Sequence, residues 1–205
     1  GPLPLAMAQR RALLDAPRPR SLELAPHAKP ARRQLPLAQT VRPEDAVRPV
    51  YCIWELTLAC DLACRHCGSR AGRARPEELD TRECLDLVRQ LAELGVKEVS
   101  VIGGEGYLRD DWVQILAEIT QRGMIANITT GGRGLTAARA RAAHGAGLRD
   151  ASVSVDGLEE THDRLRGVAG SFQSALRAMD HLHAAGVRVH NNTQINRLTL
   201  PDLVP

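Results

Sequence analysis

Three cysteines lie within eight residues in the stretch CDLACRHC, at positions Cys60, Cys64 and Cys67. Thiolates at such spacing bind metal, and two kinds of centre compete here. Structural zinc needs four ligands, but His66 is adjacent to Cys67 and no second Cys or His pair exists to complete the usual clamp. A [4Fe–4S] cluster held by three thiolates leaves one iron free to bind and activate a small molecule. The residues favour the cluster over zinc.

The five cysteines of the chain fall into two groups. Cys60, Cys64 and Cys67 are tightly clustered, whereas Cys84 lies on an apolar helical stripe and Cys52 begins a predicted strand. The odd number and the lack of an N-terminal secretory signal disfavour a disulfide framework. We expect Cys52 and Cys84 to be small core residues and the other three to be ligands.

The cysteine cluster follows the first of five strand-like runs that alternate with helical segments. The runs cover residues 51–58, 97–102, 125–130, 151–156 and 187–195. Between them, apolar residues recur at helical spacing in stripes that begin at Cys84, Trp112 and Phe172. Asp80 with Glu83 has the pattern of a capping box. Glycines that mark helix ends follow at Gly95, Gly123 and Gly186. Together they predict a parallel sheet with right-handed crossovers and about five βα units, doubly wound or curved into a barrel.

Two of these strands have a polar face. In the fourth run the polar face consists of Ser152, Ser154 and Asp156, and along the fifth it consists of Arg188, His190, Asn192, Gln194 and Asn196. A closed eight-stranded barrel fills its interior with aliphatic side chains, so a polar inner face predicts an incomplete, wider barrel with a wet cavity. The cysteines would lie at the carboxyl ends of the strands, where substrates of such folds bind.

The composition separates a leader from a folded body. The first 50 residues hold nine of the twelve prolines and predict an extended or poorly ordered leader, with the folded unit over 51–205. The net charge of +3 comes from that leader, so the body lacks the basic groove of a nucleic-acid-binding protein. No long apolar run predicts a membrane span, and a cytoplasmic protein is expected.

The chemistry-bearing segments together resemble the radical S-adenosylmethionine (SAM) superfamily. CDLACRHC matches its C-x3-C-x-aromatic-C signature, and Gly103-Gly104-Glu105 resembles its GGE motif, whose backbone pairs with the SAM amine. The segment 154–157 (SVDG) resembles its S-x-D-G segment, where the serine contacts SAM. In 162–167 (HDRLRG), the final arginine matches the one that pairs with the SAM carboxylate.

This resemblance implies a fold and a set of site residues. The fold would be a partial (β/α)6-type TIM-like barrel, truncated here after about five βα units. The metal ligands would be Cys60, Cys64 and Cys67. The residues expected to bind SAM or lie beside it are Gly103, Gly104, Glu105, Ser154, Asp156, Arg166 and His66.

The resemblance also implies a reaction. An electron from the [4Fe–4S] cluster would cleave SAM to a 5'-deoxyadenosyl radical that abstracts hydrogen from a substrate. The core is most similar to SPASM-type enzymes, which favours a ribosomally made peptide undergoing maturation. A haem precursor or another small molecule is the alternative substrate, and a non-catalytic Fe–S or zinc scaffold is the alternative of another class. An electron donor such as flavodoxin or ferredoxin is the expected partner.

Two departures from the family pattern stand out. Gly106 follows the GGE motif where many relatives have proline. The chain also stops just after the fifth strand, before the sixth βα unit, which suggests a fragment that binds a cluster without completing catalysis.

Overall fold

Five parallel strands form one sheet in the computed structural model, which describes residues 48–203. The strands are β1 (Tyr51–Thr57), β2 (Glu98–Gly103), β3 (Ile125–Thr130), β4 (Asp150–Ser154) and β5 (Arg188–Asn192). They are ordered β1-β2-β3-β4-β5, so each crossover leads to the adjacent strand and the sheet does not close. The α/β fold with an incomplete barrel is confirmed. The expected leader, residues 1–50, falls almost wholly outside the described residues.

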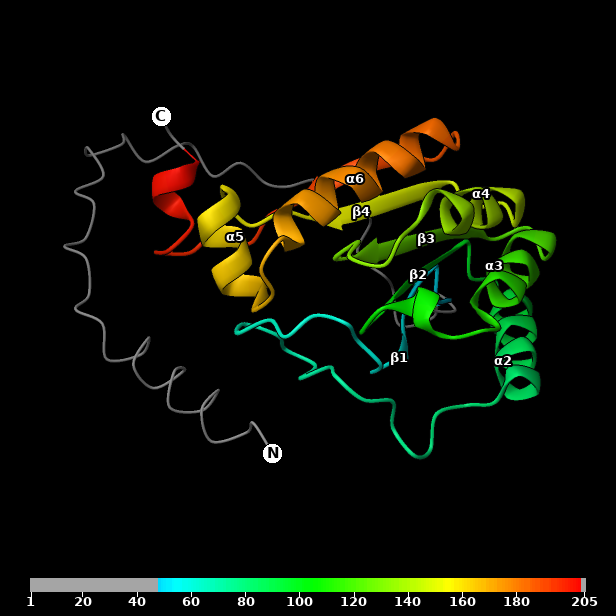
Figure 1. Ribbon diagram of the computed structural model, residues 1–205. Helices are drawn as coiled ribbons and strands as arrows, with labels where there is room; N and C mark the ends of the chain where they lie inside the picture. Colours follow the sequence, from blue (N-terminus) through cyan, green and yellow to red (C-terminus); the bar gives the residue numbers. More distant parts are fainter. Residues whose placement is uncertain (1–47, 204–205) are drawn as a thin grey trace, which may run out of the picture. The chain divides into compact units, whose positions relative to one another are not determined.

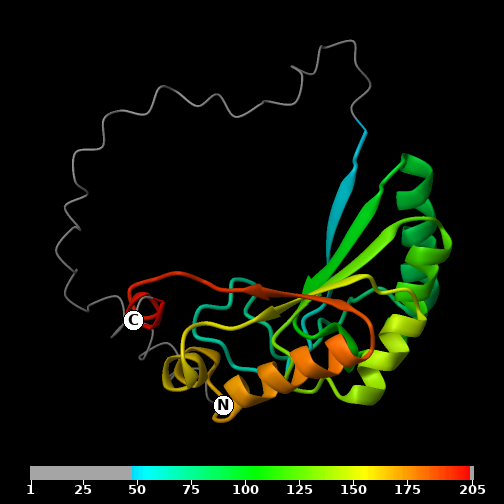
Figure 2. The same cartoon turned by 90° about the horizontal axis from the view of Figure 1, so that it is seen from above.

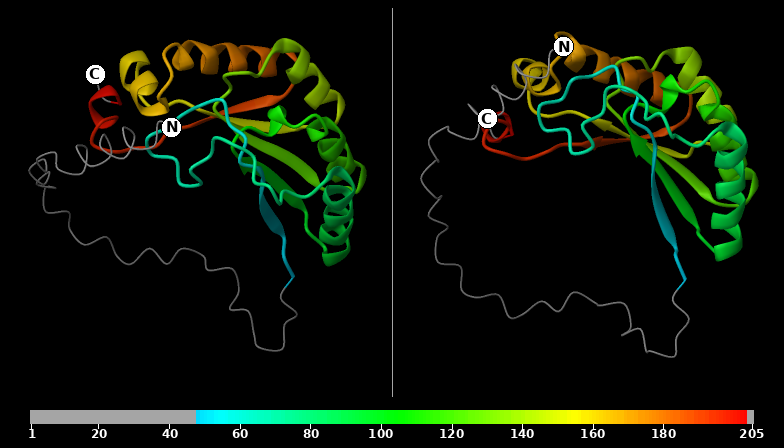
Figure 3. Two further views of the ribbon diagram at one scale, coloured as in Figure 1. Left: turned by 60° about the horizontal axis from the view of Figure 1, so that its bottom comes forward. Right: turned by 90° about the horizontal axis from the view of Figure 1, so that it is seen from below.

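Residues 48–203 form five helices. They are α2 (Thr81–Leu94), α3 (Trp112–Gln121), α4 (Ala137–Gly145), α5 (Glu159–Arg166) and α6 (Ser171–Ala184), with short 3-10 turns η1 (Gly106–Leu108) and η2 (Leu200–Asp202). The sheet curves, and α2, α3, α4 and α6 lie along its convex side (Figure 3). Helix α6 runs beside β4 and β5 (Figure 2). No helix within residues 48–203 is long and apolar enough to cross a membrane.

The core lies between the sheet and these helices. Every second residue of β2, β3 and β4 points to it, which places Val99, Val101, Ala126, Ile128, Ala151 and Val153 in the core. Ile115 and Ile119 of α3 and Leu182 of α6 are fully buried against them. Each such aliphatic side chain contributes about 1.5–3 kcal/mol relative to exposure. This packing makes the sheet a rigid platform for the loops at its carboxyl edge.

Helix α2 has the ends that its sequence predicts. The Asp80 side chain accepts a hydrogen bond from the Glu83 N–H at 2.8 Å, and the Glu83 carboxylate accepts one from the Asp80 N–H at 2.9 Å. Gly95 ends the helix with φ 92°, in the left-handed region that favours glycine. The capping box and the helix end are therefore confirmed.

Apolar spacing did not reveal helices α4 and α5. The buried face of α4 consists of alanines, Ala140 and Ala143, set among arginines, so its sequence has no apolar stripe. In α5 the buried residues are His162 and Leu165, and the rest of the helix is charged. Both helices are nevertheless stable in place, because tertiary packing rather than local periodicity decides them.

The last two strands end earlier than the sequence predicted. Strand β4 stops at Ser154, and β5 spans Arg188–Asn192 instead of 187–195. Beyond these strand ends, side chains take the place of the backbone hydrogen bonds between β4 and β5. The Thr193 hydroxyl donates to the Val155 carbonyl at 2.8 Å, and the Asp156 carboxylate accepts from the Gln194 N–H at 2.9 Å. Asn196 was expected on the strand, but its side chain accepts from the Leu198 N–H in a turn instead. That expectation was wrong.

Candidate metal centre and cofactor cavity

The three clustered cysteines lie on the segment that joins β1 to α2, residues 58–80, named here the cysteine loop. This loop and α5 lie side by side at the carboxyl ends of the strands, toward which the arrowheads of β3 and β4 point (Figure 1). The Ala63 and Arg65 N–H groups donate to the carbonyls of Arg166 and Leu165 at 3.0 and 2.8 Å. The loop is thus tied to an element about 100 residues later by its own backbone.

Each clustered thiol has one hydrogen-bond donor. The Leu62 N–H donates to Cys60 Sγ at 3.4 Å, and the Ala71 N–H donates to Cys67 Sγ at 3.3 Å. The third donor is a side chain, because Arg166 Nη1 lies 3.7 Å from Cys64 Sγ. Donors of this kind stabilise the thiolate and tune a bound iron–sulfur cluster. The donor set therefore fits a thiolate-bound metal centre.

Burial favours the protonated form of two metal-free thiols, Cys60 and Cys64. Burial, with smaller contributions from neighbouring acidic groups, raises the pKa of Cys60 to about 12, and burial raises that of Cys64. A metal must displace these protons when it binds. By contrast Cys84 is fully buried in the core, donates to the Leu79 carbonyl, and lies away from the other three.

The spacing of the thiols argues against a single ion. Tetrahedral zinc with Zn–S bonds of 2.3 Å would bring its sulfurs to about 3.8 Å from one another. Among the described residues, the group whose ligand atoms all lie within 4.8 Å is Cys60, Asp61 and Glu105, and it does not include Cys64 or Cys67. Thiols that are further apart suit a cluster in which each one binds a different iron.

The Gly103-Gly104-Glu105 segment packs directly on the cysteine loop. A Cβ on Gly103, whose φ is 124°, would lie 2.3 Å from the Thr57 carbonyl oxygen, and one on Gly104 would lie 2.0 Å from that of Ala59. The Gly104 and Glu105 N–H groups donate to these same two carbonyls, each at 2.7 Å. The glycines were expected to admit a ligand, and the structure shows that they first of all admit the backbone of the loop.

The Glu105 side chain binds the end of β3. It is 2% exposed, and it accepts from the Thr130 hydroxyl and from the Gly131 N–H, the latter at 2.6 Å. Burial raises the pKa of Glu105 to about 7 against the effect of these two donors. The carboxylate thus joins the ends of β2 and β3 at the rim of the cavity.

Asp156 joins its own segment to three others: the cysteine loop, α5 and the residues that follow β5. Its Oδ2 lies 3.1 Å from His66 Nε2 and 2.7 Å from Arg166 Nη2, its Oδ1 accepts from the Gln194 N–H, and its own N–H donates to His162 Nδ1 at 3.0 Å. Burial alone would raise the pKa of Asp156, but the His66 ring, the Gln194 N–H and the Arg166 charge lower it to about 2. Asp156 is fully buried and lies behind the cavity wall.

The other expected site residues meet around one cavity of about 420 Å³. Its wall includes Cys60, Cys64, Cys67, His66, Gly103, Gly104, Glu105, Ser154, Arg166 and Asn192. Ser154 is on β4, 7% exposed, and faces the cavity as its strand parity predicts. A second hollow of about 440 Å³ follows on the inner face of the sheet, and Tyr51, Ser100 and Thr129 line both. The inner face of the sheet is polar, as the sequence predicted.

Sequence reasoning missed part of the support of the cysteine loop. The Tyr107 hydroxyl lies 3.2 Å from both carboxylate oxygens of Asp61 and accepts from the Gly134 N–H at 3.0 Å. Arg139 stacks on the Tyr107 ring, 5.0 Å from its centroid. Asp61 lies inside the cysteine motif and Tyr107 lies two residues after GGE, so their closeness to the two motifs could have drawn attention to them. Their pairing across 46 residues is visible only in the fold.

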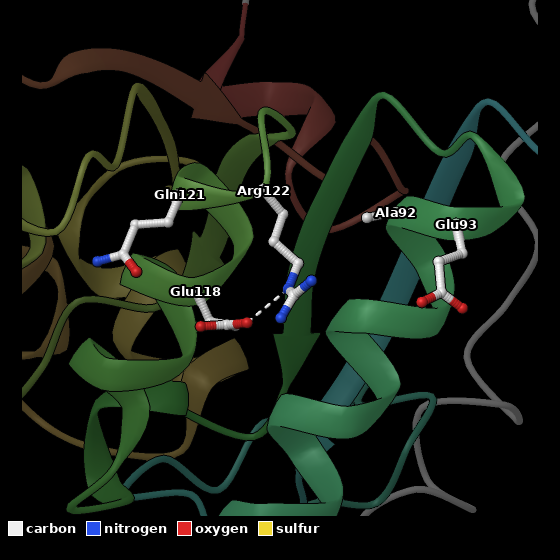
Figure 4. Close-up of a pocket in the computed structure, with 5 residues that line it drawn as sticks. All are labelled: Ala92, Glu93, Glu118, Gln121 and Arg122. Atoms are coloured by element: carbon white, nitrogen blue, oxygen red, sulfur yellow. Dashed lines mark hydrogen bonds and ion pairs between the residues drawn. The ribbon is translucent and has the colours of Figure 1, made fainter.

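A larger hollow lies elsewhere, between the carboxyl ends of α2 and α3. It measures about 530 Å³ and is lined by Ala92, Glu93, Glu118, Gln121 and Arg122 (Figure 4). Arg122 pairs with Glu118 at 2.5 Å within α3 (Figure 4). The hollow contains no thiol or imidazole and lies on the outer helix layer, so it is a surface groove between charged side chains.

Known proteins resemble this chain in sequence. It is 34% identical over 150 residues to the AdoMet-dependent heme synthase of Oleidesulfovibrio alaskensis, covering 72% of this chain and 39% of that protein. It is 37% identical over 139 residues to the mycofactocin maturase MftC of Mycobacterium ulcerans, covering 67% of this chain and 37% of that protein. The chain therefore spans less than half the length of either relative.

Solved structures share the fold. Streptococcus suis SuiB bound to S-adenosylmethionine matches with a TM-score of 0.65 at 19% identity, over 77% of this chain and 37% of that one. The family model of the Radical SAM superfamily matches residues 54–203, which contain the cysteine loop, the GGE segment and Arg166. That family uses SAM and an iron–sulfur cluster, in keeping with the donor set around the cavity. The chain belongs to the Radical SAM superfamily.

Proposed function

We propose that this chain is the catalytic core of a radical SAM enzyme, with a [4Fe–4S] cluster held by Cys60, Cys64 and Cys67. The observation that carries the proposal is that all three line one cavity of about 420 Å³, with sulfur atoms that do not all lie within 4.8 Å of one another. Each thiol has a hydrogen-bond donor that favours the thiolate. When bound, cluster and SAM supply the electron and the carbon radical that abstracts hydrogen.

The residues opposite the cysteines are proposed to hold SAM. The backbone of Gly103-Gly104-Glu105 faces the cavity and would bind the methionine amine. Arg166 would bind the carboxylate, because its Nε is buried and has no partner among the described residues. Ser154 would donate or accept at the same site, and His66, 21% exposed, would pack beside the cluster or the adenine.

A ribosomally made peptide is the proposed substrate. MftC is a maturase by name, and SuiB has been crystallised with its precursor peptide SuiA. The second hollow continues the cavity along the inner face of the sheet. Tyr51 of β1 lines both hollows and is 50% exposed, and Ile53 lines the first and is 59% exposed. An apolar strip beside polar strands would suit a peptide with mixed side chains. A haem precursor is the second candidate, supported by the 34% identity to a heme synthase.

The test is anaerobic reconstitution with iron and sulfide, followed by reduction and addition of SAM. Dithionite would stand in for the proposed donor, a flavodoxin or ferredoxin. We expect a brown protein with a [4Fe–4S] absorption spectrum and 5'-deoxyadenosine among the products. If a cluster forms but no 5'-deoxyadenosine appears, even in a longer polypeptide that includes this chain, the enzymatic proposal is refuted and a non-catalytic Fe–S scaffold remains as the interpretation. A colourless protein with one zinc per chain would refute the cluster itself.

A further inference from the structure

We propose that Asp156 is a positioning residue. It fixes the cysteine loop and Arg166 of α5 relative to each other, so that the cluster and the arginine that binds the SAM carboxylate are correctly placed. The proposal rests on the proposed function of the cavity. Asp156 itself does not line the cavity, whereas both of its side-chain partners, His66 and Arg166, do. It therefore acts through these two residues and not as a ligand.

The contacts of Asp156 come from both sides of the site. Oδ2 lies between His66 Nε2 at 3.1 Å, on the cysteine loop, and Arg166 Nη2 at 2.7 Å, on the last residue of α5. Oδ1 is occupied by the Gln194 N–H at 2.9 Å, which prevents the carboxylate from turning. The Asp156 N–H is held by His162 Nδ1 at 3.0 Å. One fully buried residue thus joins its own segment to the cysteine loop, to α5 and to the residues that follow β5.

The arrangement matters because of where Arg166 points. Its side chain is 12% exposed, Nη1 lies 3.7 Å from Cys64 Sγ, and Nη2 forms an ion pair with Asp156 Oδ2 at 2.7 Å. A guanidinium has five N–H donors in a fixed plane, so anchoring Nη2 sets the direction of the others. Without the anchor, a long arginine side chain would have to lose its rotamer freedom when the ligand binds. The anchor removes that cost in advance.

The same carboxylate orients the ring that precedes Cys67. His66 Nε2 is directed to Asp156, and its Nδ1 has no partner among residues 48–203. Outer-shell partners of a metal centre typically change its affinity or activity by 10–100-fold when they are removed. We expect an effect of that size on SAM binding, with the cluster still formed because the three thiols are intact.

The experiment compares Asp156→Asn with Asp163→Asn. Asp163 is a matched control on α5, the helix that also carries Arg166. Its carboxylate accepts from Gly170 N–H, Ser171 Oγ and Phe172 N–H at 2.5–2.8 Å, and Asp163 does not line the cavity. Each protein is reconstituted, its iron is counted, and SAM is titrated into the reduced form while the EPR signal is followed. Asp156→Asn should weaken SAM binding roughly 10–100-fold at full iron content, and Asp163→Asn less than twofold.

A second variant separates positioning from folding. His66→Gln removes one partner of Asp156 and leaves the carboxylate in place. If the three residues act as one unit, the double variant with Asp156→Asn should bind SAM no more weakly than Asp156→Asn alone. Independent, multiplying losses would overturn the proposal. So would a fully loaded Asp156→Asn protein that binds SAM within twofold of the wild type, or an equal loss in Asp163→Asn.

Hydrogen exchange in the metal-free protein supplies a readout that needs no cofactor. The Ala63 and Arg65 amides donate to α5 carbonyls, so Asp156→Asn should speed their exchange at least tenfold, whereas Asp163→Asn should not. Unchanged exchange would show that Asp156 does not fix the loop. If the wild type forms no cluster or shows no response to SAM, the proposed function fails, and the exchange result still decides whether Asp156 joins the loop to α5.

Discussion

Replacing Gly104 with alanine should separate the cysteine loop from the sheet. A Cβ at this position would lie 2.0 Å from the Ala59 carbonyl oxygen and 2.6 Å from its carbonyl carbon. Both atoms are backbone, so no side chain can rotate to relieve the overlap. The Gly104 and Glu105 N–H groups donate to the Thr57 and Ala59 carbonyls, each at 2.7 Å, and the added methyl group must push these partners apart.

The cost follows from these contacts. Overpacking of a tight site costs about 1–3 kcal/mol, and each of the two hydrogen bonds contributes about 0.5–1.5 kcal/mol net. The free energy of unfolding should fall by roughly 2–6 kcal/mol, and even the lower bound lowers the melting temperature by roughly 4–8 °C in a domain of this size. Since the displaced carbonyl directly precedes Cys60, the iron content after reconstitution should fall as well.

Gly106→Ala is the matched control, two residues along the same segment. Its Cβ would lie 3.5 Å from Val101 Cγ1 and 3.8 Å from Leu56 Cδ2, which are ordinary contacts. We expect it to leave stability unchanged or raise it by up to about 1 kcal/mol, through the reduced freedom of the unfolded chain. Urea unfolding and iron analysis of both variants make the comparison. A Gly104→Ala protein with wild-type stability and full iron would refute the reasoning.

Three further variants test other parts of the structure. Cys64→Ala should abolish iron loading while Cys84→Ala loads fully, as iron and sulfide analysis can show; loss of iron in both would contradict the separation of ligands from core thiols. Asp80→Ala removes the capping box of α2 and should lower the free energy of unfolding by about 1 kcal/mol in urea, without changing iron content. Tyr107→Phe removes the hydroxyl that joins Asp61 to the Gly134 N–H, and should cost about 1–3 kcal/mol because that half-buried amide loses its partner. An unchanged denaturation midpoint would count against either of the last two predictions.

Local sequence patterns predicted the elements that depend on local physics. The capping box at Asp80 and the left-handed helix end at Gly95 need only neighbouring residues, and both are present. Alternation in the fourth strand predicted its polar face, and Ser154 of β4 does line the cavity while Ala151 and Val153 are buried in the core. Helices α4 and α5 were missed because their buried faces are alanines or a histidine, whose burial is decided by what packs on them.

The site divides in the same way. The types and spacing of the cysteines predicted a metal centre, because thiolates so close in sequence on a loop have few other uses. The GGE segment was recognised, but the reason for its glycines is the approach of Ala59 and Thr57, which no local pattern encodes.

What only the tertiary structure decided is how the motifs hold one another. The sequence identified Asp156 as a polar residue on an inner face. Its contacts with His66, 90 positions earlier, and with Arg166, at the end of the next helix, are visible only in the folded chain. Residue types and local periodicity fixed the chemistry and the order of the elements. The relative positions of the chemical groups depend on long-range packing, because contacts between distant segments leave no period in the chain.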